Sequence, residues 1–181
     1  MKISRKKRSQ LVLKYLKKKE KTINLGSGTG EMAKFFKKNV KNLVNVDISY
    51  GNKQFNLNNK FPIKSSSYGN IIATEVIEHL DNPNFFIGEC CRILKRSGKL
   101  IITTPNMTGI PYHLSEDIGS DKFPHICAFN LKMLEYLLSK HKFKIINKFY
   151  TDFFWNKNYF FKFLAHIFPK LRSNIFIVAE K

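Results

Sequence analysis

The sequence predicts an α/β fold in which a mostly parallel sheet is covered by helices on both faces. Short apolar runs alternate with amphipathic helical segments, and the connections between them are short. The first apolar run, residues 22–25, leads into a glycine-rich turn and then into a helical pattern at residues 32–38. We expect the remaining elements to be arranged around this strand–turn–helix unit.

Gly26, Gly28 and Gly30 form the turn after the first predicted strand. Glycine adopts positive φ at little cost and lets a ligand approach the backbone closely. The N–H groups at the start of the following helix suit a nucleotide-like ligand. Asp47 ends a second apolar strand roughly 20 residues further on, the distance at which an acidic side chain meets the ribose hydroxyls of such a ligand.

The residue after the turn narrows the choice of ligand. Glu31 stands where the dinucleotide fingerprint has its third glycine, and where a phosphate-binding loop would continue with lysine. A carboxylate there would repel a pyrophosphate, but it would not repel S-adenosylmethionine, which carries a sulfonium cation and no phosphate. The pattern therefore favours S-adenosylmethionine, with a tight turn that binds no ligand as the alternative.

Composition fits one globular domain, residues 1–181, with a strongly basic balance. The formal net charge is +19, and residues 1–21 contain ten Lys/Arg against one acid. This basic N-terminal arm is either a solvated helix packed on the sheet edge or a polybasic segment that contacts RNA or an anionic membrane.

Cysteine usage predicts the compartment. Cys90, Cys91 and Cys127 are odd in number and fit neither a disulfide framework nor a C-x-x-C metal site, so we expect a cytoplasmic protein. No apolar run approaches the roughly 20 residues that span a bilayer. Peripheral contact with the inner membrane surface stays open as an alternative.

The later elements continue the alternation. Residues 68–75 form a buried apolar strand, and residues 84–94 form a helix with Lys95 and Arg96 in its last turn. A short strand is the most that residues 55–58 allow, so the second crossover is reduced. Further elements are a strand at 99–104, a helix that begins after Asn130 and a final strand at 174–180.

Four segments in fixed order carry a family resemblance: the glycine turn, residues 61–63 (Phe-Pro-Ile), residues 74–80 (Thr-Glu-Val-Ile-Glu-His-Leu) and residues 91–106, from Cys-Arg-Ile-Leu to Thr-Thr-Pro-Asn. Together they resemble the small-molecule "type 11" branch of class I S-adenosylmethionine-dependent methyltransferases, which includes ubiquinone-pathway O-methyltransferases. The resemblance covers roughly residues 21–146. It implies a Rossmann-like, doubly wound, seven-stranded sheet with an antiparallel last strand in a three-layer α/β/α sandwich.

The resemblance and the turn together define a predicted cofactor site for S-adenosylmethionine. Its residues are Gly26, Ser27, Gly28, Gly30, Asp47, Ile48, Asn56, Leu57, Thr74 and Glu75. Asn24, Ser27 and Asn56 depart from the residues usual in the family, and Asn56 replaces an Asp that often accepts from the adenine amino group. An amide oxygen still accepts a hydrogen bond, but without charge assistance.

An acceptor hydroxyl benefits from a general base, and His79 and His125 are the predicted catalytic residues. In some relatives a similar set binds a divalent metal, so Glu75, Glu78, His79 and His125 are alternative metal ligands. In many other members of the branch the Glu78–His79 pair only braces the turn after the strand.

Two segments are expected to shape the acceptor site. Residues 107–128 contain several helix and strand breakers, and Tyr112, His113 and Phe123 could line the site. Residues 149–172 are rich in aromatics and form core, a lid or a membrane-contacting segment. The predicted activity is methyl transfer to a small or lipid-like acceptor, at oxygen. The alternatives are an RNA methyltransferase and a non-catalytic partner subunit.

Overall fold

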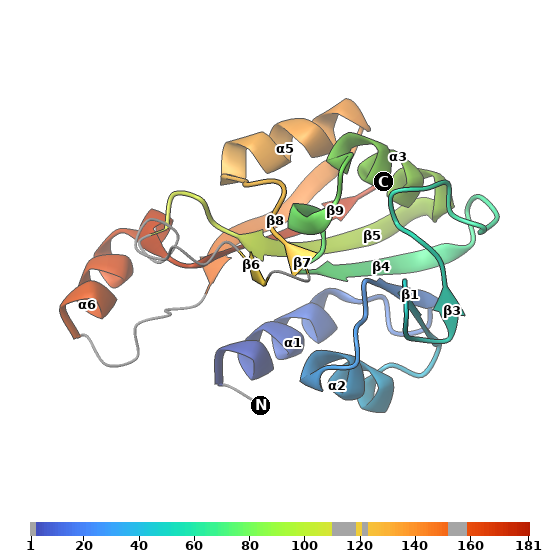
Figure 1. The fold of residues 1–181 in the computed structure, drawn as a ribbon, viewed down its shortest axis with the longest axis horizontal. Helices are drawn as coiled ribbons and strands as arrows, with labels where there is room; N and C mark the ends of the chain where they lie inside the picture. The colour runs from blue at the N-terminus through green and yellow to red at the C-terminus, as the bar shows by residue number, and fades with distance from the viewer. Residues whose placement is uncertain (1–2, 110–118, 121–122, 152–158) are drawn as a thin grey trace.

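The computed structural model describes residues 3–109, 119–120, 123–151 and 159–181. Its centre is a seven-stranded sheet with the order β3-β2-β1-β4-β5-β9-β8. Figure 1 shows α1 and α2 on one face of this sheet and α3 and α5 on the other, so the described chain forms three layers. The strands are β1 (Thr22–Leu25), β2 (Leu43–Asp47), β3 (Lys53–Gln54), β4 (Tyr68–Thr74), β5 (Leu94–Pro105), β8 (Lys144–Thr151) and β9 (Asn174–Glu180).

The helices and short elements follow the same alternation. The helices are α1 (Ile3–Tyr15), α2 (Glu31–Asn39), α3 (Pro83–Ile93), α5 (Leu131–Lys140) and α6 (Tyr159–Ile167). Two short 3-10 turns, η1 (Ile77–His79) and η2 (Pro169–Leu171), and the two-stranded pair β6 (Gly119–Ser120) and β7 (Phe123–Pro124) complete the described elements.

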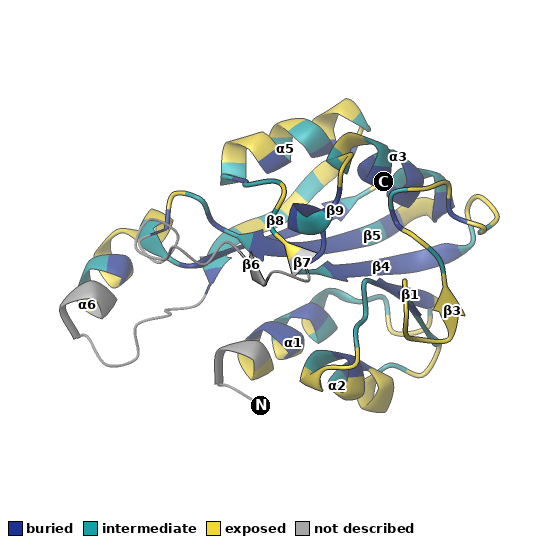
Figure 2. Ribbon diagram, viewed as in Figure 1, coloured by how far each residue is buried: buried dark blue, intermediate teal, exposed yellow. Residues whose placement is uncertain are grey.

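The predicted fold class is confirmed. β1, β2, β3, β4 and β5 pair in parallel, whereas β9 runs antiparallel to both β5 and β8. The antiparallel strand lies inside the sheet rather than at its edge, because β8 covers its outer side. Both faces of the central strands are buried, which explains why their sequences are continuous apolar runs (Figure 2).

The described core divides between the two sheet faces. The larger cluster packs α3 and α5 against one face through residues such as Phe86, Ile87 and Leu134. The smaller cluster packs α1 and α2 against the other face, where Val12 and Phe36 meet Ile72. The helix α1 therefore lies on the face of the sheet, not on its edge as predicted, and its C-terminal half supplies a buried side chain at Val12.

Two boundaries differ from the prediction. β5 begins at Leu94 rather than at residue 99, because Leu94 is fully buried and pairs with Tyr68 before the register shifts. Lys95 and Arg96 consequently lie in extended chain instead of the last turn of a helix. The short strand of the second crossover is Lys53–Gln54, paired with β2, rather than residues 55–58.

A buried carboxylate ties α3 to the loop before β4. Glu89 accepts hydrogen bonds from the backbone N–H of Phe61 at 2.8 Å and from the guanidinium of Arg92 at 2.7 Å. Arg92 in turn donates to the carbonyls of Phe61 and Ile63. The hydrogen bonds from Arg92, followed by the one from Phe61, lower the pKa of Glu89 against the opposing effect of burial.

We predict that Glu89→Gln lowers the free energy of unfolding by about 1–3 kcal/mol at pH 7, because charge-assisted hydrogen bonds are lost from a buried site. A carboxyl group whose pKa is lower in the folded state than in the unfolded state stabilises the fold at pH values above the unfolded-state pKa. This stabilisation disappears as the pH falls through the folded-state pKa. The difference between wild type and variant should therefore shrink in acid. Denaturant titrations at several pH values measure it.

Glu20→Gln is the matched control, because Glu20 pairs with Lys95 at the protein surface. Its effect should stay below about 1 kcal/mol, as is usual for exposed ion pairs. Equal losses for the two variants would contradict the assignment of Glu89 as a structural link.

Candidate functional site

The glycine turn has the backbone conformation that a close ligand approach requires. Gly26 and Gly28 have φ values of 63° and 54°, where side chains are rarely tolerated. A Cβ at Gly26 would also lie 2.5 Å from Cγ2 of Val76. Gly30 has a negative φ and serves differently: it is the N-cap of α2, and the space where its Cβ would stand is open.

Asp47 fixes the turn from the neighbouring strand. Its Oδ2 accepts from the backbone N–H of Gly28 at 2.8 Å, and its Oδ1 accepts from the N–H of Ser49. The N–H of Ser27 donates to the carbonyl of Val46 at 2.8 Å. The end of β2 and the turn after β1 are therefore held together at the carboxyl edge of the sheet, where ligands bind in open α/β sheets.

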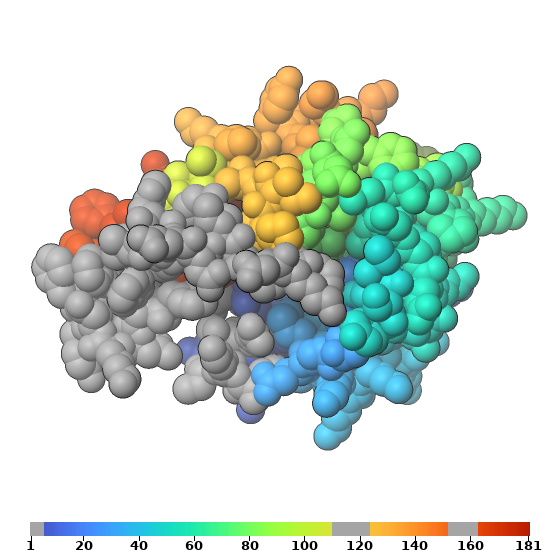
Figure 3. All heavy atoms as spheres, in the orientation of Figure 1, coloured from blue at the N-terminus to red at the C-terminus, as the bar shows by residue number. Residues whose placement is uncertain are grey.

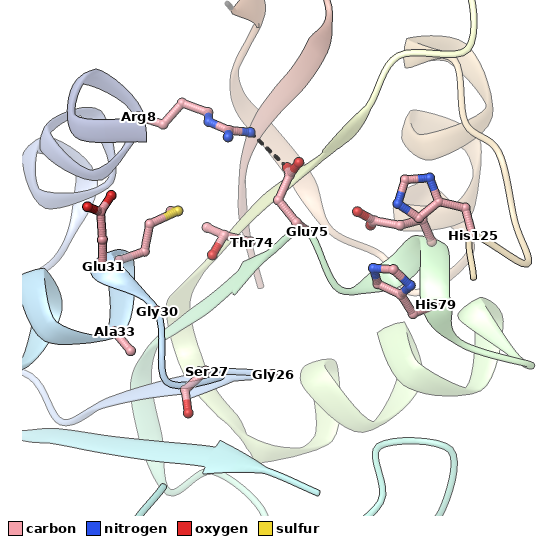
Figure 4. Close-up of a pocket in the computed structure, with 12 residues that line it drawn as sticks. Arg8, Gly26, Ser27, Gly30, Glu31, Ala33, Thr74, Glu75, His79 and His125 are labelled. Atoms are coloured by element: carbon pink, nitrogen blue, oxygen red, sulfur yellow. Dashed lines mark ion pairs between the residues drawn. The ribbon is translucent and has the colours of Figure 1, made fainter. Parts of the chain in front are cut away.

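A cavity of about 270 Å³ opens over this turn. Its walls come from α1, the turn, the start of α2, the end of β4 and the segment before α5. In Figure 4, Arg8 and Glu31 lie on one side of the opening and His79 and His125 on the other, with Gly26 and Ser27 below. The lining residues are Arg8, Gly26, Ser27, Gly30, Glu31, Met32, Ala33, Thr74, Glu75, Glu78, His79 and His125.

The cavity brings together half of the predicted cofactor residues. Gly26, Ser27, Gly30, Thr74 and Glu75 line it, and Gly28 and Asp47 stand behind the turn.

The other three predicted cofactor residues do not line the cavity. Ile48 is exposed, and Leu57 is buried in the core. Asn56 is exposed and uses its Oδ1 to accept from the N–H of Asn58. Their cofactor role stays a prediction.

Arg8 is a site residue that sequence reasoning missed. It lies on α1, is only 6% exposed, and places its Nη1 3.0 Å from Oε1 of Glu75 (Figure 4). The first 21 residues contain ten basic residues, and nothing in the sequence distinguishes Arg8 from the other nine. Arg8 is buried because α1 packs against the face of the sheet. The sequence of α1 has no clear apolar stripe, so it does not predict this packing.

Glu75 is a structural centre of the cavity wall. It has a positive φ of 57°, which turns its side chain out of the strand direction. Its carboxylate accepts from Oγ1 of Thr103 at 2.8 Å and from Nδ2 of Asn174 at 2.9 Å, in addition to the ion pair with Arg8. These contacts join α1 to strands β5 and β9. Glu75 was also a predicted metal ligand, but the ligand atoms that lie close together in the described residues belong to Glu78, His79 and His125.

The other three predicted ligands do come together. Ligand atoms of Glu78, His79 and His125 all lie within 4.8 Å of one another, and the two imidazole rings meet edge to face with centroids 4.8 Å apart. Nδ1 of His79 lies 2.9 Å from the carbonyl oxygen of Pro124. A carbonyl only accepts, so Nδ1 carries a proton, and in the neutral ring Nε2 holds the lone pair.

Glu78 is the most buried member of this group, at 1% exposure. Its Oε2 accepts from Oγ1 of Thr104, whereas its Oε1 has no hydrogen-bond partner within the described part of the chain. Burial, and then the negative charge of Glu75, raise the pKa of Glu78 well above its usual value. The carbonyl of Glu78 accepts from the N–H groups of Ile126 and Cys127, which holds the segment carrying His125 against η1.

Several predicted acceptor-side features lie outside the described residues. Tyr112 and His113 fall in residues 110–118, and residues 152–158 of the aromatic segment are also not described. The side chain of Phe123 is also not described.

Comparison with known proteins agrees with this architecture. Residues 3–148 match a family described as "Methyltransferase domain". The chain is 38% identical over 60 residues to the human "Ubiquinone biosynthesis O-methyltransferase, mitochondrial", a segment that makes up 31% of this chain and 16% of that protein. It is 30% identical over 100 residues, or 55% of this chain and 36% of the other, to a Mycolicibacterium smegmatis protein named "Probable S-adenosylmethionine-dependent methyltransferase".

Solved structures share the fold over almost the whole chain. An S-adenosylmethionine-dependent methyltransferase from Archaeoglobus fulgidus superposes with a TM-score of 0.73 at 17% identity, covering 97% of this chain and 92% of that one. A Burkholderia thailandensis N-methyltransferase, solved with its acceptor and S-adenosylhomocysteine, superposes with a TM-score of 0.69 at 12% identity, covering 99% and 78%. By its sequence match and its sheet order, the chain belongs to the methyltransferase-domain family.

Proposed function

We propose that this protein transfers the methyl group of S-adenosylmethionine to an oxygen atom of a small or lipid-like acceptor. One observation carries the proposal: a single cavity joins the glycine turn, supported by Asp47, to the group of Glu78, His79 and His125 (Figure 4). The first half of the cavity suits the methyl donor, and the second half suits activation of an acceptor hydroxyl. The ubiquinone-pathway relatives, named as O-methyltransferases, support oxygen as the target.

The residues present fit S-adenosylmethionine. The missing Cβ of Gly30 leaves open space beside the N-terminus of α2, and the turn at Gly26 is too close to Val76 for a side chain. The carboxylate of Asp47 would accept hydrogen bonds from the ribose hydroxyls. When bound, S-adenosylmethionine supplies an electrophilic methyl group on a sulfonium centre.

Arg8 and Glu31 would receive the amino-acid end of this cofactor. Both line the cavity near the start of α2, and they offer opposite charges for the carboxylate and the ammonium group. Arg8 already pairs with a carboxylate, Glu75, in the structure. A guanidinium recognises a carboxylate through paired, charge-assisted hydrogen bonds, which is the geometry required at this end.

His79 would accept the acceptor's proton. Its Nδ1–H donates to the carbonyl of Pro124, which leaves Nε2 of the neutral ring to accept a proton, and His79 lines the cavity. Nε2 of the neutral ring would take the hydroxyl proton of the acceptor as its oxygen gains the methyl group, so that no positive charge stays on the acceptor. A positioned base contributes roughly 10²–10⁴-fold to such a step.

The same three side chains also fit a divalent cation. Two imidazoles and one carboxylate are a common ligand set, and the unpartnered Oε1 of the buried Glu78 would gain a partner. Such an ion would orient the acceptor and lower the pKa of its hydroxyl group. His79, His125 and Glu78 would hold it.

We predict that Arg8→Gln weakens S-adenosylhomocysteine binding about ten- to a hundredfold, because a charge-assisted contact to the carboxylate is lost. Methylthioadenosine lacks the amino-acid end, so its affinity should be unchanged. Calorimetry with both ligands makes the comparison. Lys7→Gln, at an exposed position on the same helix, is the control. An equal loss for both ligands would mean that Arg8 acts only through the fold.

The activity is tested by incubating the purified protein with methyl-labelled S-adenosylmethionine and a cell extract, then separating lipid-soluble, small polar and RNA fractions. We predict label in the lipid-soluble or small-molecule fraction. His79→Ala should lower the rate by roughly 10²-fold or more without changing S-adenosylhomocysteine affinity. His141→Ala, which removes a histidine outside the cavity, should leave the rate intact. Label confined to RNA would contradict the proposed acceptor class.

Chelator treatment of the same reaction separates the two roles of the histidines. Loss of activity that returns with Mg²⁺, Mn²⁺ or Zn²⁺, together with a stoichiometric ion found by elemental analysis, assigns a metal to Glu78, His79 and His125. Activity that is indifferent to chelator assigns proton transfer to the histidines alone.

A further inference from the structure

The C-terminal half of α6 and the residue after it expose a cluster of large apolar side chains. Phe163, Ile167 and Phe168 are 61%, 50% and 56% exposed. Phe163 and Ile167 lie one turn apart on α6, and Phe168 directly follows the end of the helix. The N–H of Phe168 donates to the carbonyl of Leu164, which holds this residue against the last turn of α6. We call these three residues the α6 apolar face.

This face is held in position by the rest of the molecule. Arg172 donates from Nε to the carbonyl of Ala165 and from Nη1 to the carbonyl of Tyr150, which ties α6 to the end of β8. Ala165, on the same helix, is buried. The α6 apolar face is therefore presented outward, and Figures 1 and 3 show this described part of α6 at one end of the molecule.

The charged residues in this part of the sequence have one sign. The sequence contains no Asp or Glu between Asp152 and Glu180, but it contains Lys157, Lys162, Lys170 and Arg172. Lys170 is exposed and follows the α6 apolar face directly. Apolar side chains beside basic residues are the combination that inserts at the boundary between headgroups and acyl chains of an anionic bilayer.

The same segment is connected to the rim of the functional cavity. Nδ2 of Asn106, just past the end of β5, donates to the carbonyls of Lys170 and Arg172 at 2.8 Å each. Asn174, at the start of β9, donates to Glu75 in the cavity wall. A surface docked through α6 would thus lie on the side of the molecule to which the carboxyl end of the sheet opens.

We propose that the α6 apolar face docks this protein onto the surface of an anionic phospholipid bilayer. Three side chains offer far less area than the roughly 800 Å² that each partner buries in a stable protein–protein interface. They are sufficient for peripheral contact when basic residues add electrostatic attraction. No helix of the described residues is long and apolar enough to cross a membrane, so the contact is with its surface. The proposal does not depend on the methyl acceptor.

The test is co-sedimentation of the full chain with sucrose-loaded vesicles of phosphatidylcholine alone or with roughly a quarter phosphatidylglycerol. The wild type should bind the anionic vesicles. The double variant Phe163→Ser/Phe168→Ser should lose at least about tenfold in partitioning, because each buried phenylalanine contributes substantially to transfer.

The matched control is Met133→Ser/Tyr136→Ser, which removes two exposed apolar side chains from α5. Its partitioning should equal that of the wild type. A cooperative thermal unfolding transition in all three proteins shows that they are folded, and binding of S-adenosylhomocysteine is measured separately. Failure of the wild type to bind this ligand would overturn the proposed function while leaving the vesicle result valid.

Unchanged vesicle binding by the α6 double variant would overturn the proposal and assign any membrane contact to the basic N-terminal residues. Absence of wild-type binding to anionic vesicles would also overturn it. Light scattering could instead show a dimer for the wild type and a monomer for the α6 variant. That result would overturn the proposal and assign the α6 apolar face to contact with a second copy of the chain. Loss of binding in the α6 variant alone, with the control intact, supports the bilayer.

Discussion

The hydrogen bond from the backbone of Gly28 to the carboxylate of Asp47 is the contact on which the functional site depends. It joins the turn after β1 to the end of β2, and it requires the positive φ that only glycine adopts at little cost. With this contact in place, the N-terminus of α2 faces a cavity rather than a neighbouring strand. Asp47 stands behind the turn at the carboxyl edge of the sheet, and the proposed function assigns it to the ribose of the cofactor.

The second organising feature is the ion pair between Arg8, which is buried, and Glu75 in the cavity wall. Glu75 is fixed by Thr103 and Asn174 from two neighbouring strands, and Arg8 reaches it from α1. Burying charges is costly unless they are paired and hydrogen-bonded, and these contacts meet that condition. The pairing also leaves Glu78 as the carboxylate beside His79 and His125, and the charge of Glu75 contributes to its raised pKa. Glu75, directly after β4, and Glu78, in η1, thus have different roles.

Most of the fold followed from sequence because its signals are local. The buried runs of β1, β4 and β9, the glycine turn and the cap at Asn130 each depend on a few neighbouring residues. Arg8 and the contacts of Glu75 depend on packing between segments far apart in the chain, so no local pattern announces them. The start of β5 at Leu94 is similar, because the pairing with Tyr68 decides it. Resemblance to a family placed His79 and His125 together, but only the fold shows that Glu75 is separate from them.

The most direct test of this account is calorimetric binding of S-adenosylhomocysteine to the wild type and to Asp47→Ala. The account predicts one site per chain in the wild type and a loss of affinity of roughly tenfold or more in the variant, because charge-assisted hydrogen bonds to the ribose and the brace on Gly28 disappear together. Glu135→Gln, which changes an acid on α5 away from the cavity, should bind as the wild type does. Wild-type binding that is absent at near-millimolar ligand, or that is unaffected by Asp47→Ala, would contradict the account.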